Sequence, residues 1–138
     1  MTKINKVAVI GTGVIGAGWI IRCLAHNKIV YAYDKDIKLK KSLINEIKRT
    51  WPYVKKLFNK NTLNLKNFKF FTSIDEALKD VDLIQECVSE NYALKTRLMN
   101  TIGKYAKRNA IISSSSSGLL PTKIYSKCKN PERAMIGH

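Results

Sequence analysis

The segment VAVIGTGVIGAGW, residues 7–19, constrains the fold of this chain more than any other stretch. Four apolar residues, three of them β-branched, run directly into Gly11, Gly13 and Gly16. An apolar pattern with helical period follows over residues 14–27. A buried strand, a glycine-rich turn and a helix in this order form the first half of a strand–helix–strand unit. The N-terminal part of the chain therefore predicts a parallel sheet covered by helices.

The same alternation of strands and helices continues to the last residue. Apolar runs of four to seven residues predict strands, and helical periodicity predicts helices between them. Strands that are apolar on both faces are typical of parallel sheets buried between two layers of helices. We therefore expect one doubly wound α/β domain over residues 1–138, with a mostly parallel sheet and helices on both faces. The expected strands are 6–11, 29–34, 68–72, 82–88, 110–115 and 133–138.

Three local features of the expected helices can be tested directly. The first helix should bury its apolar stripe, which comprises Ile15, Trp19, Cys23 and Leu24. The second helical pattern begins at Ile37 and should be interrupted at Trp51–Pro52, because proline cannot continue the helix hydrogen-bond ladder without a kink. A short helix further along should open with a capping box formed by Ser73 and Glu76.

The composition of the chain disfavours some classes of protein, such as nucleic-acid-binding and metal-binding proteins, but it does not by itself indicate a function. The net charge of +15 is high, but only five of the 25 basic residues are arginines, and the lysines are scattered along the chain. Specific base readout relies on arginine, so a nucleic-acid partner is disfavoured. The densest basic segment, residues 35–60, fits the solvated face of a helix or a patch for an anionic ligand. Three distant cysteines without a CxxC pair predict reduced thiols and no metal site.

The glycine spacing and one acidic residue together predict a dinucleotide site. Gly11 permits the tight turn, Gly13 allows a pyrophosphate to approach the backbone, and Gly16 allows close packing of helix and strand. The backbone N–H groups of residues 12–16 would face the phosphates. Asp34 ends the next strand, 18 residues after Gly16, where it can accept hydrogen bonds from the adenosine ribose and repel a 2′-phosphate. This favours NAD over NADP, although Lys35 weakens the inference. The alternative is a glycine-rich loop without a ligand.

Two further groups lie at the carboxyl ends of expected strands, where open α/β sheets bind ligands. The serine run in IISSSSSGLLP is either a polar loop or a source of hydroxyl donors to a substrate oxygen or nicotinamide. His138 ends the last expected strand, and a histidine there can act as the general base for an alcohol. His26 ends the first helix and is expected to be a cap or a surface residue.

Taken in order, these motifs resemble the NAD-binding domain of the 3-hydroxyacyl-CoA dehydrogenase family. The resemblance rests on VAVIGTGVIGAGW, YAYD, DLIQECVSEN with Lys95, SSSSSGLLP and PERAMIGH, and it covers essentially all 138 residues. Within the family, GWIIRCLAHN, RTWP, SGLLP and NPERAMIGH carry a narrower likeness, to members that act on L-carnitine. The implied small-molecule substrate is therefore L-carnitine or a 3-hydroxyacyl-CoA.

The resemblance also implies roles for individual residues. Its cofactor-binding positions are Gly11, Thr12, Gly13, Val14, Ile15, Gly16, Asp34, Glu90, Lys95 and Ser117. Glu90 and Lys95 match residues near the nicotinamide end of NAD. Ser117 matches a residue that binds the substrate's 3-hydroxyl oxygen, and His138 matches the catalytic base. From the residues alone, Glu90 is equally an acid that stabilises a helix N-terminus, Lys95 an exposed helical lysine and Ser117 one of five neighbouring serines.

The chain departs from the family after His138. Members continue with an acid that orients the histidine and with a helical domain that covers the substrate and forms most of the dimer. We therefore expect cofactor recognition to persist better than turnover in this chain. Three functions remain open: a cytoplasmic dehydrogenase portion, a stand-alone dinucleotide-binding module that senses NAD or completes a site with a separate helical partner, and an inactive fragment. The expected macromolecular partner is the missing helical domain or a second copy of the chain. The N-terminus lacks the apolar segment of a signal peptide, and no membrane partner is expected.

Overall fold

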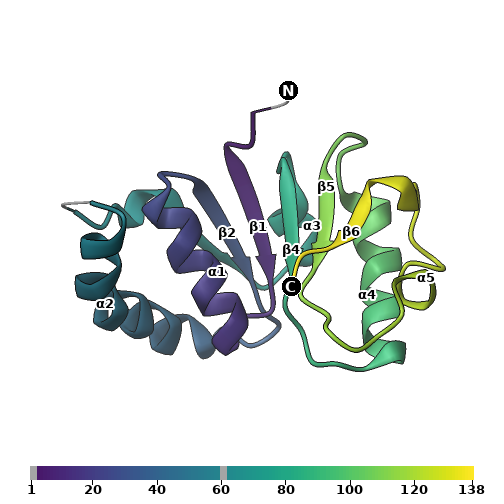
Figure 1. Ribbon diagram of the computed structural model, residues 1–138, viewed down its shortest axis with the longest axis horizontal. Coiled ribbons are helices and arrows are strands. Elements are labelled where there is room, and N and C mark those ends of the chain that lie inside the picture. Colours follow the sequence, from purple (N-terminus) through teal and green to yellow (C-terminus); the bar gives the residue numbers. More distant parts are fainter. Residues whose placement is uncertain (1–2, 60–61) are drawn as a thin grey trace.

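The computed structural model describes residues 3–59 and 62–138. Its centre is a sheet of six parallel strands in the order β3-β2-β1-β4-β5-β6 (Figure 1). The expected doubly wound α/β fold is confirmed. The strands are β1 (Lys6–Ile10), β2 (Ile29–Tyr33), β3 (Phe68–Phe71), β4 (Leu83–Glu86), β5 (Ile111–Ser114) and β6 (Ala134–Ile136). The helices are α1 (Val14–Ala25), α2 (Leu39–Leu57), α3 (Ile74–Leu78), α4 (Tyr92–Tyr105) and α5 (Pro121–Ile124), with 3-10 turns at Leu65–Asn67 and Pro131–Arg133.

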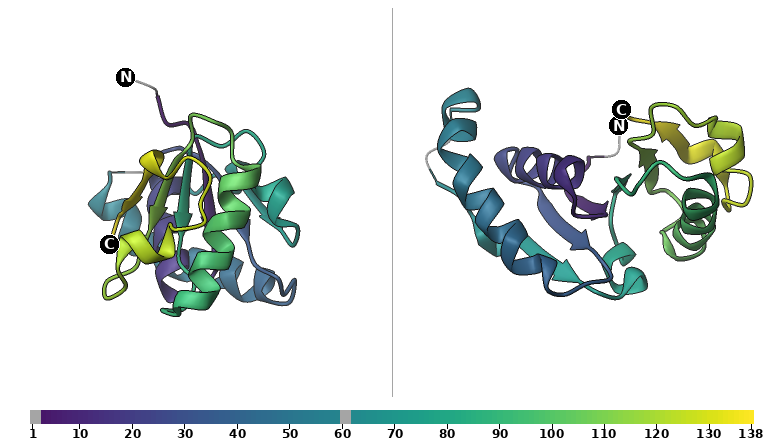
Figure 2. Two further views of the ribbon diagram at one scale, coloured as in Figure 1. Left: turned by 90° about the vertical axis from the view of Figure 1, so that its right-hand side faces the viewer. Right: turned by 90° about the horizontal axis from the view of Figure 1, so that it is seen from below.

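Helices cover both faces of the sheet, and each face has its own apolar core (Figure 2). On one face, α1 and α2 pack over Val7 and Val9 of β1. On the other face, α3, α4 and α5 pack over Ala8 and Ile10. Alternate residues of one central strand thus enter opposite cores, as the pleat of a doubly covered strand requires. Among the described residues, no helix is long and apolar enough to cross a membrane.

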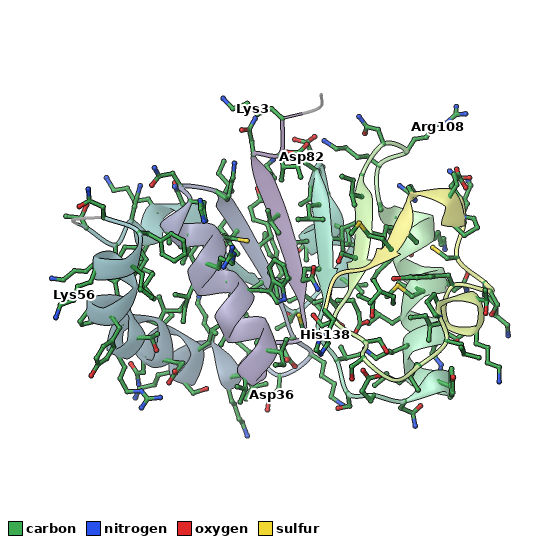
Figure 3. The ribbon with its side chains drawn as sticks, in the orientation of Figure 1. Lys3, Asp36, Lys56, Asp82, Arg108 and His138 are labelled. Atoms are coloured by element: carbon green, nitrogen blue, oxygen red, sulfur yellow. The ribbon has the colours of Figure 1, made fainter. Side chains whose placement is uncertain are left out.

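Strand order reverses between β1 and β4, and this is the point that organises the candidate site. The chain first winds outward from β1 to β2 and β3, and then returns to β4 on the other side of β1. The loops that leave the carboxyl ends of β1 and β4 therefore diverge and leave a crevice between them. His138 and Asp36 lie at this end of the sheet, opposite Asp82 and Lys3 (Figure 3).

The first helix differs from expectation at its start. Cys23 and Leu24 are buried and Trp19 packs partly against the core, but Ile15 is 58% exposed. The buried stripe of α1 begins at Gly16 and Ala17 instead. The first turn of α1 projects beyond the edge of the sheet, so its side chains have no strand beneath them. Ile15 is consequently available to a ligand and contributes nothing to the core.

The predicted interruption of the second helix is wrong. α2 starts at Leu39, two residues later than expected, and continues through Pro52 to Leu57. Its buried residues, at spacings of three and four, are Leu43, Ile47, Trp51 and Val54. Because Trp51 and Val54 prolong the stripe across the proline, their burial offsets the cost of about 3 kcal/mol that an interior proline imposes. The described lysines of α2 are exposed, as expected for a solvated face, and Lys60 lies outside the described residues.

The capping box at α3 does not form. Ser73 is the N-cap residue, but its hydroxyl bonds the carboxylate of Asp75 and makes no cap hydrogen bond to the backbone. An acid two residues ahead competes for the hydroxyl, since short polar side chains readily bond near neighbours in the chain. A cap that the sequence analysis missed occurs at α4, where Asn91 accepts a hydrogen bond from the N–H of Leu94 at 2.9 Å.

Candidate functional site

The glycine turn between β1 and α1 has two glycines that the fold requires. Gly11 has a φ of +94°, a region that other residues rarely adopt, and its N–H donates to the carbonyl of Tyr33 at 2.9 Å. A Cβ built on Gly16 would lie 1.9 Å from the carbonyl oxygen of Gly11. Both positions therefore need glycine for the turn and for the approach of helix to strand, as the motif predicts.

Gly13 has no such structural requirement. Its φ of −66° is open to any residue, and a Cβ at this position would meet nothing within 4 Å. Gly13 is also the N-cap of α1, with no side-chain cap hydrogen bond and no acid in the first turn. The free N–H groups at the start of α1 thus face an open space that a Cβ would partly fill. This arrangement suits a phosphate at the positive end of the helix dipole.

Asp34 is tied to the glycine turn through Thr12. One carboxylate oxygen, Oδ2, accepts hydrogen bonds from the N–H of Thr12 at 3.1 Å and from its hydroxyl at 2.9 Å. The other oxygen, Oδ1, has only a long contact of 3.5 Å with the N–H of Asp36. Asp34 therefore closes the turn with one oxygen and retains acceptor capacity on the other. The Thr12 contact was not foreseen, although a hydroxyl between the first two glycines was the available signal.

A hollow of about 370 Å³ adjoins the other side of the α1 N-terminus. Val14 and Ile15, which are 90% and 58% exposed, line it together with Ser115 and His138. The structure thus brings the first residues of α1, which belong to the glycine turn segment, and His138, two residues beyond β6, to the same hollow. A second hollow of about 480 Å³ lies between α1 and α2 and reaches Thr12 and Gly13.

Lys95 is not the exposed helical lysine that its position in α4 suggests. Its side chain is 1% exposed, and its ammonium lies 2.7 and 2.9 Å from the two carboxylate oxygens of Glu86. The ammonium also donates to the carbonyl of Val88 at 3.1 Å. Glu86 in turn accepts hydrogen bonds from the N–H of Val88 at 2.7 Å and from the hydroxyl of Ser114. This buried ion pair holds the loop after β4 in place, and Lys95 does not reach the crevice surface.

Glu90, at the other end of that loop, binds the serine run. One oxygen accepts from the Ser116 hydroxyl and the other from the N–H of Ser117, both at 2.7 Å. Desolvation raises the pKa of Glu90. The two hydrogen bonds and the charges of Lys95 and His138 lower this pKa by a larger amount, so the net shift is downward. Glu90 is therefore an anion that orders the loop carrying the exposed Ser117.

These observations define a dinucleotide-binding domain, because a glycine turn, an uncapped helix N-terminus and an acid after β2 meet at the switch point of a parallel sheet. Comparison with known proteins gives the family. The family model described as "3-hydroxyacyl-CoA dehydrogenase, NAD binding domain" matches residues 6–138. The chain belongs to this family.

Similar sequences and structures agree with that assignment. The L-carnitine dehydrogenase of Oceanobacillus iheyensis is 44% identical over 134 residues, which are 97% of this chain and 44% of that protein. The L-carnitine dehydrogenase of a Pseudomonas species is 38% identical over 138 residues, 100% of this chain and 43% of that protein. The chain thus spans less than half the length of these relatives.

Solved structures of 3-hydroxybutyryl-CoA dehydrogenases have the same fold. The enzyme from Ralstonia eutropha has a TM-score of 0.88 at 26% identity, covering 99% of this chain and 49% of that one. The enzyme from Escherichia coli has a TM-score of 0.87 at 27% identity, covering 98% and 29%.

Proposed function

We propose that this chain is the NAD-binding portion of an oxidoreductase that oxidises the 3-hydroxyl group of an L-3-hydroxy substrate. The observation that supports the proposal is the crevice at the β1–β4 switch point: Asp34 bonds Thr12 of the glycine turn, and Val14, next to Gly13, lines one hollow with His138. Bound NAD would supply the hydride acceptor. The groups that bind the cofactor, orient the substrate and accept the proton would come from the protein.

The cofactor residues divide into two groups. The uncapped N–H groups after Gly13 would hold the pyrophosphate, and Oδ1 of Asp34 would accept from the adenosine ribose. Val14 and Ile15 would cover the cofactor with apolar surface. Glu90 and Lys95 would act at the nicotinamide end, Glu90 by ordering the loop of Ser117 and Lys95 by holding the loop after β4 through Glu86.

His138 and Ser117 would act on the substrate. The imidazole of His138 would take the proton of the 3-hydroxyl group, because a ring nitrogen is a proton acceptor near neutral pH. The hydroxyl of Ser117 would donate a hydrogen bond to the same oxygen. Glu90 lies near both residues and remains ionised, so it would stabilise the positive charge that His138 gains.

We infer L-carnitine as the substrate, with a 3-hydroxyacyl-CoA as the alternative. The named relatives at 35–44% identity support L-carnitine. The lysines of α2 could meet the phosphates of a CoA ester, but they are scattered and solvated. A role in the cytoplasm, and a helical partner or self-association that raises the rate above that of the chain alone, belong to the same proposal.

The test is NADH formation by this chain with NAD and either L-carnitine or L-3-hydroxybutyryl-CoA. We expect slow turnover with L-carnitine, and a decrease of about 100-fold or more in His138→Asn, the usual effect of losing a general base. His26→Asn is the matched control and should keep the rate. Turnover with the CoA ester alone would contradict the substrate assignment. Binding of NADH without turnover of either substrate would leave the chain a dinucleotide-binding module.

A further inference from the structure

Two polar side chains end the central strand β4, one on each face of the sheet. Leu83 and Ile84 belong to opposite cores, and the pleat sends Gln85 to the side of α1 and Glu86 to the side of α4. Glu86 is explained by its ion pair with Lys95. Gln85 is 1% exposed, has no such partner and takes no part in the chemistry proposed above. Its contacts reach toward the end of the chain.

The amide of Gln85 donates to two oxygens beside the crevice. Its nitrogen lies 2.7 Å from the hydroxyl of Ser115 and 3.3 Å from the carbonyl of Gly137. Because a carbonyl oxygen only accepts, the nitrogen of the amide must face Gly137. One buried side chain thus connects β4 both with Ser115, which follows β5, and with Gly137, which precedes His138.

Gly137 is held on its other sides as well. Its N–H donates to the carbonyl of Ser114 at 2.9 Å, and a Cβ at this position would lie 2.2 Å from the hydroxyl of Ser113. β6 itself has only three residues and pairs with β5 alone. The last peptide unit before His138 therefore depends on a few contacts, and the contact to its carbonyl comes from Gln85.

We propose that Gln85 is a positioning residue for His138. Its amide fixes the Gly137 carbonyl, and with it the direction in which His138 leaves the sheet toward the hollow that it shares with Ser115. Ser115 accepts from this amide, and its hydroxyl also lies 3.3 Å from the sulfur of Cys87. The significance for catalysis rests on the proposed function of His138, but the positioning itself does not.

Nuclear magnetic resonance of the full chain tests the positioning without turnover. Gln85 is the only glutamine, and His26 and His138 are the only histidines, so their side-chain signals can be assigned. Gln85→Met keeps the length and removes the donors to the Gly137 carbonyl, so the end of β6 should open more readily. The Gly137 N–H, whose bond to the Ser114 carbonyl breaks in that opening, should then exchange with solvent roughly tenfold faster, as the loss of about one hydrogen bond implies. The ring signals of His138 should move toward those of an unstructured peptide, and those of His26 should not change.

Ser114→Ala is the matched control, because it removes a buried hydroxyl that bonds Glu86 on the opposite face of the same sheet edge. It should leave the His138 ring signals in place. Unchanged Gly137 exchange and His138 signals in Gln85→Met would overturn the proposal, and so would an equal change in Ser114→Ala. If Gln85→Met does not fold, the unmodified chain still decides: nuclear Overhauser contacts from the Gln85 amide protons to Gly137 support the proposal, and their absence refutes it.

Discussion

Replacing Lys95 with methionine is expected to lower the free energy of unfolding by about 3–5 kcal/mol. Methionine fills much of the space of lysine but leaves the Glu86 carboxylate buried without its cation. The hydrogen bonds from Val88 and Ser114 remain, yet they do not neutralise the charge. Chemical denaturation followed by circular dichroism measures the effect.

Two further variants identify the cause. Glu86→Gln combined with Lys95→Met removes both charges and should recover most of the lost stability, because a buried pair replaced as a unit is often neutral. Lys104→Met removes an exposed lysine of the same helix and should change stability by less than about 0.5 kcal/mol. A Lys95→Met protein as stable as the parent chain would show that Lys95 is not buried beside Glu86 in solution.

Replacing Gly13 with valine is expected to weaken NADH binding by about 100-fold while leaving the fold intact. A Cβ at this position meets no protein atom within 4 Å and the φ of −66° suits any residue, so the fold should persist, with a loss of about 1 kcal/mol because valine is a poorer N-cap than glycine. The same side chain would occupy the space in front of the free N–H groups of α1. Loss of two hydrogen bonds to a charged phosphate, at about 1.5 kcal/mol each, gives a factor of this size. Calorimetric titration with NADH measures it.

Gly18→Ala is the matched control for Gly13→Val. Gly18 lines the same two hollows one turn further along α1, beyond the free N–H groups of the first turn, and a Cβ there also meets nothing within 4 Å. Alanine should stabilise the helix by about 0.5–1 kcal/mol and leave NADH binding as it is. If Gly13→Val bound NADH as tightly as the parent chain, the pyrophosphate would not lie at the α1 N-terminus.

The fold was predictable because its signals are local and repeated. Strands apolar on both faces and helices between them determine a parallel sheet, and the Gly11–Gly16 spacing identifies its first turn. Local signals failed where tertiary contacts decide. Pro52 predicts a break, but the burial of Trp51 and Val54 keeps α2 continuous. Ile15 has the spacing of a core residue, but the first turn of α1 lies beyond the sheet.

The supporting shell of the site was not predictable for a related reason. The sequence predicts that Lys95 is solvated, because it lies in a polar helix. Only the fold shows that Glu86 of β4 lies beside it and forms a buried ion pair. The role of Gln85 likewise cannot be predicted from the sequence, because it depends on the pairing of β6 with β5, which places the Gly137 carbonyl beside the Gln85 amide. Motifs locate the residues that face a ligand, whereas contacts between distant strands determine what holds them in place.

The most direct test of the dinucleotide assignment is calorimetric titration of this chain with NADH and, separately, with NADPH. We expect saturable binding of NADH, and binding of NADPH that is at least tenfold weaker, because the Asp34 carboxylate would repel a 2′-phosphate. A folded chain that binds neither nucleotide, or that binds both equally well, would contradict this expectation.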